Sequence, residues 1–470
     1  MTARSDGPRV VAAPTAEGRS LATSDSVMPG HARHGFPIRA WLVILTLHVG
    51  LGAYDALHPD AFLRADRAES RWVDVRDASD AMRSGRLEGL LIARGNPGDY
   101  IVQAVLFSIG GRSGIIAVQA LLMLLAGFAV FRLALMLGLP WVDARTAMVV
   151  SLALPHAVIL PHQLSSEALE APLLALSVAC LAASSAGRPL AFAACAGALT
   201  GVAALVRPVT LMWPPLAAAL LAGRTRRNRI ATYLALSYLP AALWWADVAS
   251  HTGTIGMGAS RANLGHNLYD RVELMIETLP AAGSVDARRR FLEPQHEHTL
   301  ALGDYARFAA AQPQAFAAHS LRDAAVFVAK SGVERIFVDY LGWNPAARAG
   351  LQDPRRGWRQ QLAARGPRET LSYLWRTQGA VLPISLVGAL AMLALSALAV
   401  FGAWRHRRWL GADAPAGRPA FALVVALPLY ALLCSQVADA VQSRHRAPVE
   451  FAIVLLAVAG ARSLQTRAAA

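Results

Sequence analysis

Apolar runs of about 20 residues recur along this chain, and they constrain its fold more than any other feature. Such a run is long enough for an α-helix to cross the hydrocarbon core of a bilayer, where a spanning helix satisfies its own backbone hydrogen bonds. Since 55% of the residues are hydrophobic and 16% are charged, we expect an all-α polytopic membrane protein of about ten transmembrane helices. We predict spans at residues 39–57, 114–137, 145–161, 166–185, 189–206, 208–222, 230–249, 380–403, 419–438 and 447–462.

Arginine clusters in short loops orient these spans. The densest clusters are "GRTRRNR", ending at residue 229, and "WRHRRW", starting at residue 404. The positive-inside rule places both clusters in the cytoplasm. Both lie on that side if the N-terminus is also in the cytoplasm. The same threading puts two long segments outside, at residues 58–113 and 250–379.

The chain then divides into a membrane domain over 39–462 and two cytoplasmic tails, over 1–38 and 463–470. The first tail mixes Ser, Pro, Gly, Arg and Asp, cannot bury a core, and is expected to be disordered. We expect a multi-pass protein of a bacterial inner membrane with both termini cytoplasmic.

Both external segments contain helical patterns. The stretch "GNPGDYIVQAVLFSIGG" is apolar but too short to span, so it is expected to lie in the membrane interface or to re-enter it. Apolar residues recur at helical spacing over 324–340, which predicts an amphipathic helix packed on the membrane domain.

The composition argues against several other functions. The net charge of +14 comes from arginines at span ends and in one long loop, not from a continuous basic stripe, so nucleic acid is not an expected partner. The three cysteines lie inside apolar runs and are expected to pack as small hydrophobes. His296, Glu297 and His298 are adjacent, so their side chains point apart, and we predict no metal site there.

Several charged residues break the membrane rules. Arg207, after the fifth span, and Arg444 and Arg446, before the last span, lie on the side where the positive-inside bias disfavours arginine. Glu167 lies at the outer start of the fourth span, with His162 about one helical turn away. A lone outer arginine can simply snorkel to lipid phosphate, but two such exceptions together with an acid favour a shared anion site.

The first external segment supplies further acids. Interleaved arginines favour a solvated surface for most of them, but one acid turned toward a membrane cavity would serve as a base. The six acids are Asp60, Asp66, Glu69, Asp74, Asp77 and Asp80.

The order of these features resembles the C-type (GT-C) polyprenyl-phosphate-dependent glycosyltransferases, the superfamily of lipid A aminoarabinose transferases and protein O-mannosyltransferases. The resemblance rests on "FLRADRAES" after the first span, "GNPGDYIVQAVLFSIGG", "SLALPHAVILPHQLSSEAL", "GALTGVAALVRPV", "RANLGHNLY" and "SRHRAPVEFAIVLLA" before the last helix. It covers most of residues 39–462 and implies a GT-C-like fold.

The resemblance also implies roles. Asp66 corresponds to the general base of the family, with Glu69 and Asp74 as rivals because Arg67 replaces the second acid of the usual acidic pair. Glu167 corresponds to a second-loop acid with a catalytic role. Arg207 and Arg446 correspond to ligands of the carrier phosphate, and Arg444 is a further candidate. No cofactor is required, although branches of the superfamily differ in metal use and a divalent cation stays open.

We therefore expect a glycosyltransferase that moves a sugar from a polyprenyl-phosphate donor to a glycan, lipid or protein acceptor at the outer face of the membrane. The chemistry fits these residue types: a carboxylate would take the acceptor proton, and arginines would neutralise the departing phosphate. The alternative is a polytopic lipid or solute transporter or flippase, since it also uses many helices and an anion site, although we see no paired halves. A lipid headgroup transferase fits less well, because it would usually need a soluble metal-binding domain.

Overall fold

The computed structural model describes residues 37–63, 68–85, 97–223, 225–253, 259–295, 298–341, 381–407, 417–436 and 443–468, with a few isolated positions between 368 and 379. Every regular element in these ranges is helical. Residues 39–470 group as one unit by their internal contacts. Of the tail predicted over 1–38, residues 1–36 lie outside the described residues.

Six helices are long and apolar enough to cross a membrane. They are α1 (Ile38–Leu57), most of α3 (Pro97–Met136), α6 (Glu167–Ser185), α17 (Val381–His406), α18 (Gly417–Ser435) and the last helix, α19 (Glu450–Ala468), together with the turn before it. A seventh candidate is the pair formed by α4 (Trp141–Ala153) and the short helices α5 (Pro155–Ile159) and η2 (Leu160–His162), which bends by 62°. The prediction of an all-α membrane protein is thus confirmed.

The remaining predicted spans are also helical, but they do not meet the same criterion of length and composition. These are α7 (Leu190–Val206), η3 (Pro208–Met212) with α8 (Trp213–Leu221), and α9 (Arg227–Thr252). α7 packs closely on α9: a Cβ added to Gly197 would approach the Tyr233 carbonyl oxygen to 2.6 Å, and one added to Gly201 would approach that of Leu236 to 2.8 Å. Such small-residue contacts are typical of membrane helix packing. The number of ten spans stays a prediction.

Helix α3 contains a break where the interfacial stretch was predicted to end. Gly110 and Gly111 have non-helical backbone angles, and the φ of Gly111 is +63°, a conformation that glycine adopts without steric cost. The stretch from Pro97 to Ile109 is therefore a helix in its own right, redirected at the two glycines. The long run that follows, to Met136, matches the predicted second span.

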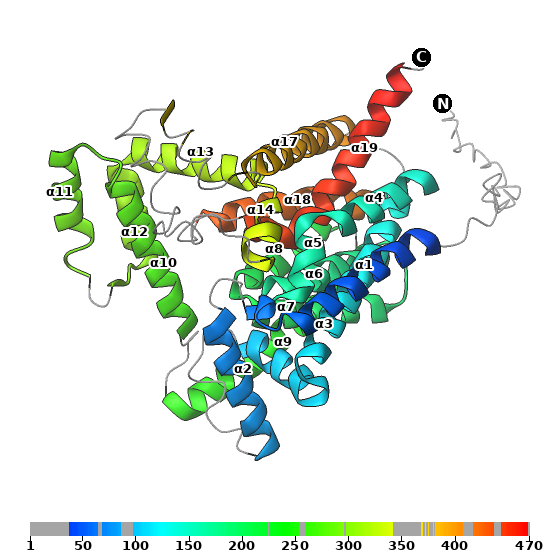
Figure 1. Cartoon of the computed structure of the whole chain (residues 1–470), viewed down its shortest axis with the longest axis horizontal. Coiled ribbons are helices and arrows are strands. Elements are labelled where there is room, and N and C mark those ends of the chain that lie inside the picture. Colours follow the sequence, from blue (N-terminus) through cyan, green and yellow to red (C-terminus); the bar gives the residue numbers. More distant parts are fainter. Residues whose placement is uncertain are drawn as a thin grey trace, which may run out of the picture. The chain divides into compact units, whose positions relative to one another are not determined.

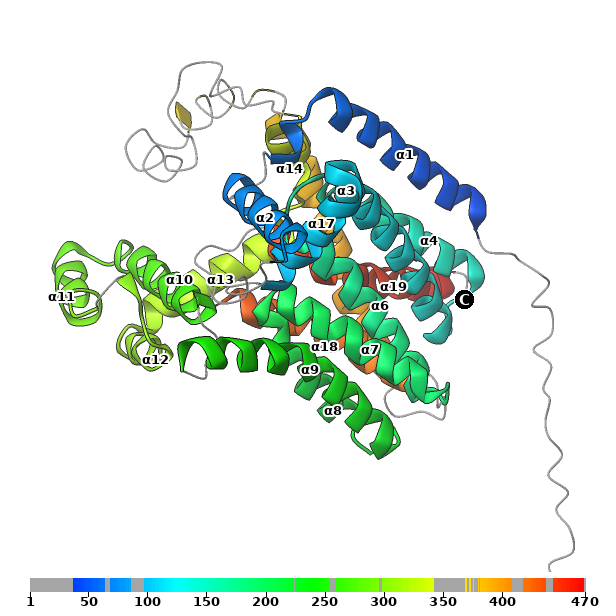
Figure 2. The same ribbon diagram turned by 90° about the horizontal axis from the view of Figure 1, so that it is seen from below.

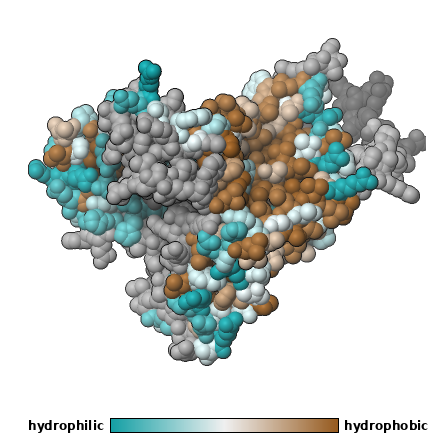
Figure 3. Space-filling view, in the orientation of Figure 1, coloured by the Kyte–Doolittle hydropathy of each residue, from teal (hydrophilic) through white to brown (hydrophobic). Residues whose placement is uncertain are grey.

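The segment predicted to be the second external one is a helical layer beside the apolar helices (Figures 1 and 2). It contains α10 (Ala259–Ile276), α11 (Ala281–Phe291), α12 (Leu302–Ala311) and α13 (Pro313–Ala329). Helices α10 to α12 bury a small core of their own, which includes Val272, Phe291 and Phe308. Figure 3 shows hydrophilic residues over α10 to α12 and over α2 (Ala68–Arg83), and a wide hydrophobic surface over the apolar helices. This contrast fits a membrane-embedded body with segments outside it.

The prediction of a single helix over 324–340 is wrong in one respect, because the helix is interrupted in the middle. Helix α13 ends at Ala329, Gly332 has a φ of +81°, and the chain resumes as α14 (Val333–Arg335) and the π-helical turn η5 (Ile336–Tyr340). Gly332 lies against the ring of His156, and a Cβ there would collide with it. Close packing on α5 therefore overrides a periodicity that would have continued the helix.

Candidate functional site

Arg207 and Glu167, predicted to share a site, do lie together. Arg207 follows the last residue of α7, and its Nη1 lies 2.9 Å from Glu170 Oε2 and 3.5 Å from Glu167 Oε1. Thr210 donates a hydrogen bond of 2.8 Å to the other oxygen of Glu170. Both acids stand in the first turn of α6, where a helix N-terminus favours negative charge.

Asp99, at the start of α3, extends this group. Its carboxylate accepts a 2.7 Å hydrogen bond from Gln103 and lies 3.6 Å from the Arg71 guanidinium. It also interacts electrostatically with Glu167 and Arg207. We call Arg71, Asp99, Glu167, Glu170 and Arg207 the acid–arginine cluster.

The acid–arginine cluster holds more carboxylates than guanidinium groups. Burial alone lowers the pKa of Arg207, but the carboxylates of Glu170 and Glu167 outweigh burial and raise that pKa above its ordinary value. The Arg207 charge is thus already compensated within the protein. An incoming phosphate at Arg207 would have to compete with two carboxylates.

Arg446 is built into the interior. Its side chain is 0% exposed, and its guanidinium donates to Glu450 Oε1 at 3.1 Å and to the backbone oxygens of Phe327, Val328 and Lys330. These carbonyls end helix α13, so the arginine satisfies acceptors that the helix itself leaves open. His156 Nδ1 lies 2.8 Å from the same Glu450 oxygen. Arg446 therefore acts as a cap that ties α13 to the start of α19.

The other predicted residues are placed as follows. Asp66 lies outside the described residues, as do the side chains of Glu69 and Arg444. Asp74 is half-buried on α2. His296 and Glu297 are likewise outside the described residues, and within the described part no three His, Cys, Asp or Glu side chains gather as a metal site.

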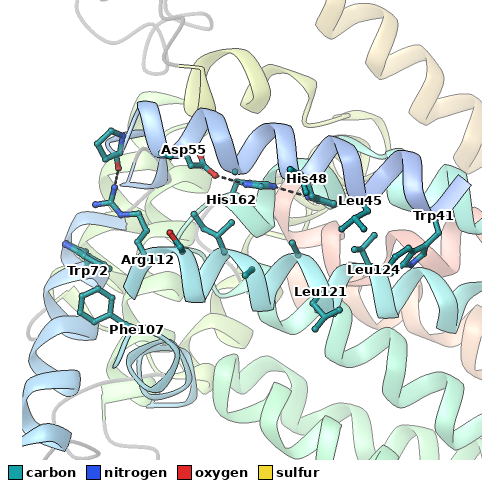
Figure 4. Close-up of a pocket in the computed structure, with 18 residues that line it drawn as sticks. Trp41, Leu45, His48, Asp55, Trp72, Phe107, Arg112, Leu121, Leu124 and His162 are labelled. Carbon is teal, nitrogen blue, oxygen red and sulfur yellow. Dashed lines mark hydrogen bonds and ion pairs between the residues drawn. The ribbon is translucent and has the colours of Figure 1, made fainter. Parts of the chain in front are cut away.

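His162 lies elsewhere, in the wall of a cavity of about 630 Å³ between α1 and α3. We call this cavity the α1–α3 groove (Figure 4). Trp41, Leu45, Leu121 and Leu124 line the end near the start of α1, whereas Trp72, Phe107 and Arg112 line the opposite end. The walls are mainly apolar, and the polar side chains among them are few.

Arg112 is the cation at that second end. Its guanidinium lies 5.4 Å from the ring centre of Phe62 and 5.6 Å from that of Trp72, and it donates to the carbonyl oxygen of Pro59. Among the described residues, no carboxylate forms an ion pair with it, in contrast to Arg207 and Arg446. It is therefore a cation held by aromatic faces with donors left for an anion.

Asp55 and His48, on α1, complete the polar lining together with His162. Asp55 Oδ2 lies 2.7 Å from His162 Nδ1, and His162 Nε2 lies 3.0 Å from His48 Nδ1. All three side chains are buried, with exposed fractions of 4% or less.

Sequence reasoning missed Asp55, His48, Glu170 and Arg112. Asp55, His48 and Glu170 fall inside predicted spans, and ionisable residues there are costly and commonly functional, so the signal was present in the sequence. Arg112 had no such signal, because it sits between an interfacial stretch and a span, where arginine is ordinary.

Comparison with known proteins assigns no family: no family model matches the chain, and neither a curated protein nor a solved structure matches it.

Proposed function

We propose that this protein is a membrane glycosyltransferase that moves a sugar from a polyprenyl-phosphate carrier to an acceptor hydroxyl at the outer face of a bacterial inner membrane. The proposal includes a ten-span, GT-C-like arrangement with both termini in the cytoplasm. The observation that carries it is the α1–α3 groove, which combines apolar walls, an arginine at its end that pairs with no described carboxylate, and a buried carboxylate with two imidazoles beside it.

The groove suits a carrier with a single long hydrocarbon chain. Its volume of about 630 Å³ lies in the range of ligand sites, and its walls run along α1 and α3 between aliphatic and aromatic side chains. An isoprenoid chain has the same apolar chemistry as those walls, as the lipid tails around a membrane helix do.

Arg112 suits the phosphate of that carrier. A guanidinium offers a planar fork of donors that holds two phosphate oxygens at once, and here its cation is not neutralised by a described carboxylate. We therefore propose Arg112 ahead of Arg207 and Arg446 as the phosphate ligand, because Arg207 is paired with Glu167 and Glu170 and the donors of Arg446 cap α13.

The proposed chemistry needs a cation and a base. The bond between the anomeric carbon and the phosphate oxygen breaks, its electron pair stays on that oxygen, and the acceptor oxygen forms the new bond while its proton leaves. A cation at the phosphate stabilises the growing charge. Asp66 stays the predicted base, and Glu167, at the start of α6, stays a predicted catalytic carboxylate.

A lipid transporter or flippase is the second candidate. The hydrogen-bonded pair His48–His162 beside Asp55 favours it, because chains of acids and histidines inside membrane helices are typical of proton-coupled carriers. A transporter would bind the same lipid without breaking the bond to the sugar.

The test has two parts. Lipids that copurify with the protein are identified by mass spectrometry, and binding of undecaprenyl phosphate is measured in detergent for the wild type and for Arg112→Gln, Arg207→Gln and Arg145→Gln. Arg145 is the matched control, since its guanidinium also lies over an aromatic ring, that of Trp141 at 5.2 Å, but outside the groove.

We expect Arg112→Gln to weaken binding by about tenfold or more, because a charged hydrogen bond to phosphate is lost, and Arg145→Gln to bind as the wild type does. If Arg207→Gln alone weakened lipid binding, the phosphate site would lie at the acid–arginine cluster. Equal binding by all four proteins would show that the groove does not hold a lipid phosphate. A sugar-bearing lipid that is translocated but never cleaved would favour the transporter.

A further inference from the structure

Helix α1 packs on the rest of the molecule along a narrow face. Of its 20 residues, only Ile44, His48 and Asp55 are buried, and two of these three are ionisable. In an 18-residue apolar stretch of α1, 17% is buried, against 72% in α6. Figure 2 shows α1 at the edge of the group of apolar helices. The contact of α1 with its neighbours therefore depends on polar side chains to an unusual degree for a membrane helix.

His48 and Asp55 fasten α1 to two other elements. Asp55 Oδ2 lies 2.7 Å from His162 Nδ1, and His162 Nε2 lies 3.0 Å from His48 Nδ1 (Figure 4). Tyr340, on η5, donates to Asp55 Oδ1 at 2.7 Å, and its hydroxyl also lies 3.3 Å from the Leu51 carbonyl oxygen. Each hydrogen bond that the structure describes between α1 and another element leads to His162 or Tyr340. We call Asp55, His48, His162 and Tyr340 the polar seam.

Toward α3, helix α1 lines the α1–α3 groove instead of packing closely. Its lining residues run from Trp41 to Ala56, about four helical turns, and they face α3 residues between Phe107 and Leu124. A Cβ added to Gly50 or Gly52 would have nothing within 4 Å, so the α1 backbone approaches no neighbour there. Helix α1 is thus one wall of the groove along its length, and a movement of α1 would open the groove sideways to the bilayer.

The two ends of α1 are held differently. Directly after the helix, the Pro59 carbonyl oxygen accepts a hydrogen bond from Arg112, and Phe62 is fully buried in a hydrophobic cluster with side chains of α2 and α3. At the start of the helix, Ile38 and Val43 are more than half exposed. The C-terminal end is therefore a fixed point about which the rest of α1 can turn once the polar seam is broken.

We propose that α1 is a lateral gate of the α1–α3 groove, which pivots near Phe62 and is held closed by the polar seam. The inference rests on the proposed function, since the ligand that passes the gate is polyprenyl phosphate dissolved in the bilayer. Its long hydrocarbon chain enters sideways along the whole groove instead of threading in from one end. Its phosphate meets Arg112 beside the pivot, where the movement of α1 is smallest.

A polar seam suits a gate inside a membrane. Lipid tails are as apolar as the outer side chains of α1, so apolar contact alone drives this helix only weakly toward its neighbours. An acid and two imidazoles that turned toward lipid would lose their partners, so their hydrogen bonds favour the closed position. Because one movement of α1 breaks all of these bonds together, the helix has two positions, with the seam made or broken.

The first experiment measures the position of α1 without a lipid ligand. Spin labels are attached to Val43→Cys on α1 and Leu429→Cys on α18, both exposed positions, in protein whose native cysteines are replaced by alanine. Pulsed electron–electron double resonance then gives the distance distribution in nanodiscs without polyprenyl lipid. A reference pair, Val142→Cys on α4 with Leu429→Cys, leaves α1 unlabelled.

The seam is broken by Asp55→Leu, which keeps a side chain of similar size, and more mildly by Tyr340→Phe, which removes only the hydroxyl. Thr46→Val is the matched control, since Thr46 is a polar residue of the same helix whose exposed hydroxyl bonds only to the Leu42 carbonyl oxygen. We expect Asp55→Leu to add a population of longer α1–α18 distances, Tyr340→Phe a smaller one, and Thr46→Val none. The reference pair should stay unchanged in all variants. Wild-type α1–α18 distances in both seam variants would overturn the gate.

The second experiment measures lipid exchange. Association and release of fluorescent undecaprenyl phosphate are followed in nanodiscs by stopped flow. Asp55→Leu should speed both association and release by about tenfold or more, because the open position is reached more often, and Thr46→Val should exchange at the wild-type rates. Faster release with unchanged association would make Asp55 a plain contact of the lipid and would also overturn the gate.

The failure of the gate and the failure of the proposed function are distinguishable. Wild-type association and release in Asp55→Leu, with the lipid bound by both proteins, would leave the glycosyltransferase standing with a rigid groove. If the wild type bound no undecaprenyl phosphate, the result would count against the proposed function and against the lipid named here, whereas the distance measurement would still decide whether α1 moves.

Discussion

Arg446 shows how one buried side chain can serve stability where sequence reasoning expected a ligand. Its guanidinium joins Glu450 to the last carbonyls of α13, and both charged groups are buried. Arg446→Gln would leave Glu450 without its arginine and the α13 carbonyls without a donor. We expect a loss of about 3–5 kcal/mol of stability, the usual cost of breaking a buried ion pair, measured by thermal or denaturant unfolding in detergent.

Arg462→Gln is the control for this change, on the helix that carries Glu450. Arg462 pairs with Asp143 at 3.1 Å, but its side chain is 44% exposed, so its loss should cost about 0–1 kcal/mol. If Arg446→Gln were as stable as Arg462→Gln and instead lost only lipid binding, Arg446 would be a phosphate ligand after all.

At the scale of elements, α17 is held by its contact with α19. Only 11% of an 18-residue apolar stretch of α17 is buried, so most of that stretch is open. Where it meets α19, a Cβ on Gly402 would collide with the Leu456 carbonyl, and one on Gly460 with the Leu398 carbonyl. The two backbones approach this closely because neither residue has a side chain.

Gly402→Val should therefore separate the two helices and lower the unfolding temperature, with new proteolytic cleavage after reconstitution as a second readout. Gly50→Ala is the control: Gly50 is also inside a membrane helix, but nothing lies within 4 Å of a Cβ added there. Alanine should be neutral or stabilise by up to about 1 kcal/mol at that position. An unfolding temperature for Gly402→Val equal to that of the wild type would mean that the close crossing does not hold α17.

At the scale of the whole molecule, the arginine clusters predict which segments leave the cytoplasm. Helix α2 and helices α10 to α12 carry hydrophilic surface and belong to the two segments expected outside. Cysteines introduced at Ser84 and Ser284 should react with an impermeant thiol reagent in cells whose outer membrane has been made permeable. Asn228→Cys, in the arginine cluster expected in the cytoplasm, should react only after lysis. Protection at both serines with labelling at Asn228 would reverse the orientation.

The sequence by itself determined where the helices are. Spans predicted at 39–57, 166–185, 380–403 and 419–438 match α1, α6, α17 and α18 within a few residues. This works because a membrane helix depends on a local run of apolar side chains and on hydrogen bonds within the segment. The same local information pointed to Glu167 and Arg207, which do meet, and to His162, although not to its partners.

Only the tertiary structure decided which charges are partnered. From the sequence, Arg207 and Arg446 were both predicted to bind phosphate, and Arg112 was overlooked. In the structure, Arg207 pairs with acids of α6, Arg446 caps α13, and Arg112 lies at the end of the α1–α3 groove. His48 and His162 are 114 positions apart, and their contact depends on how α1 is rotated against η2. Such rotations are set by close packing of whole helix faces, and neither hydropathy nor residue spacing records which face a helix presents.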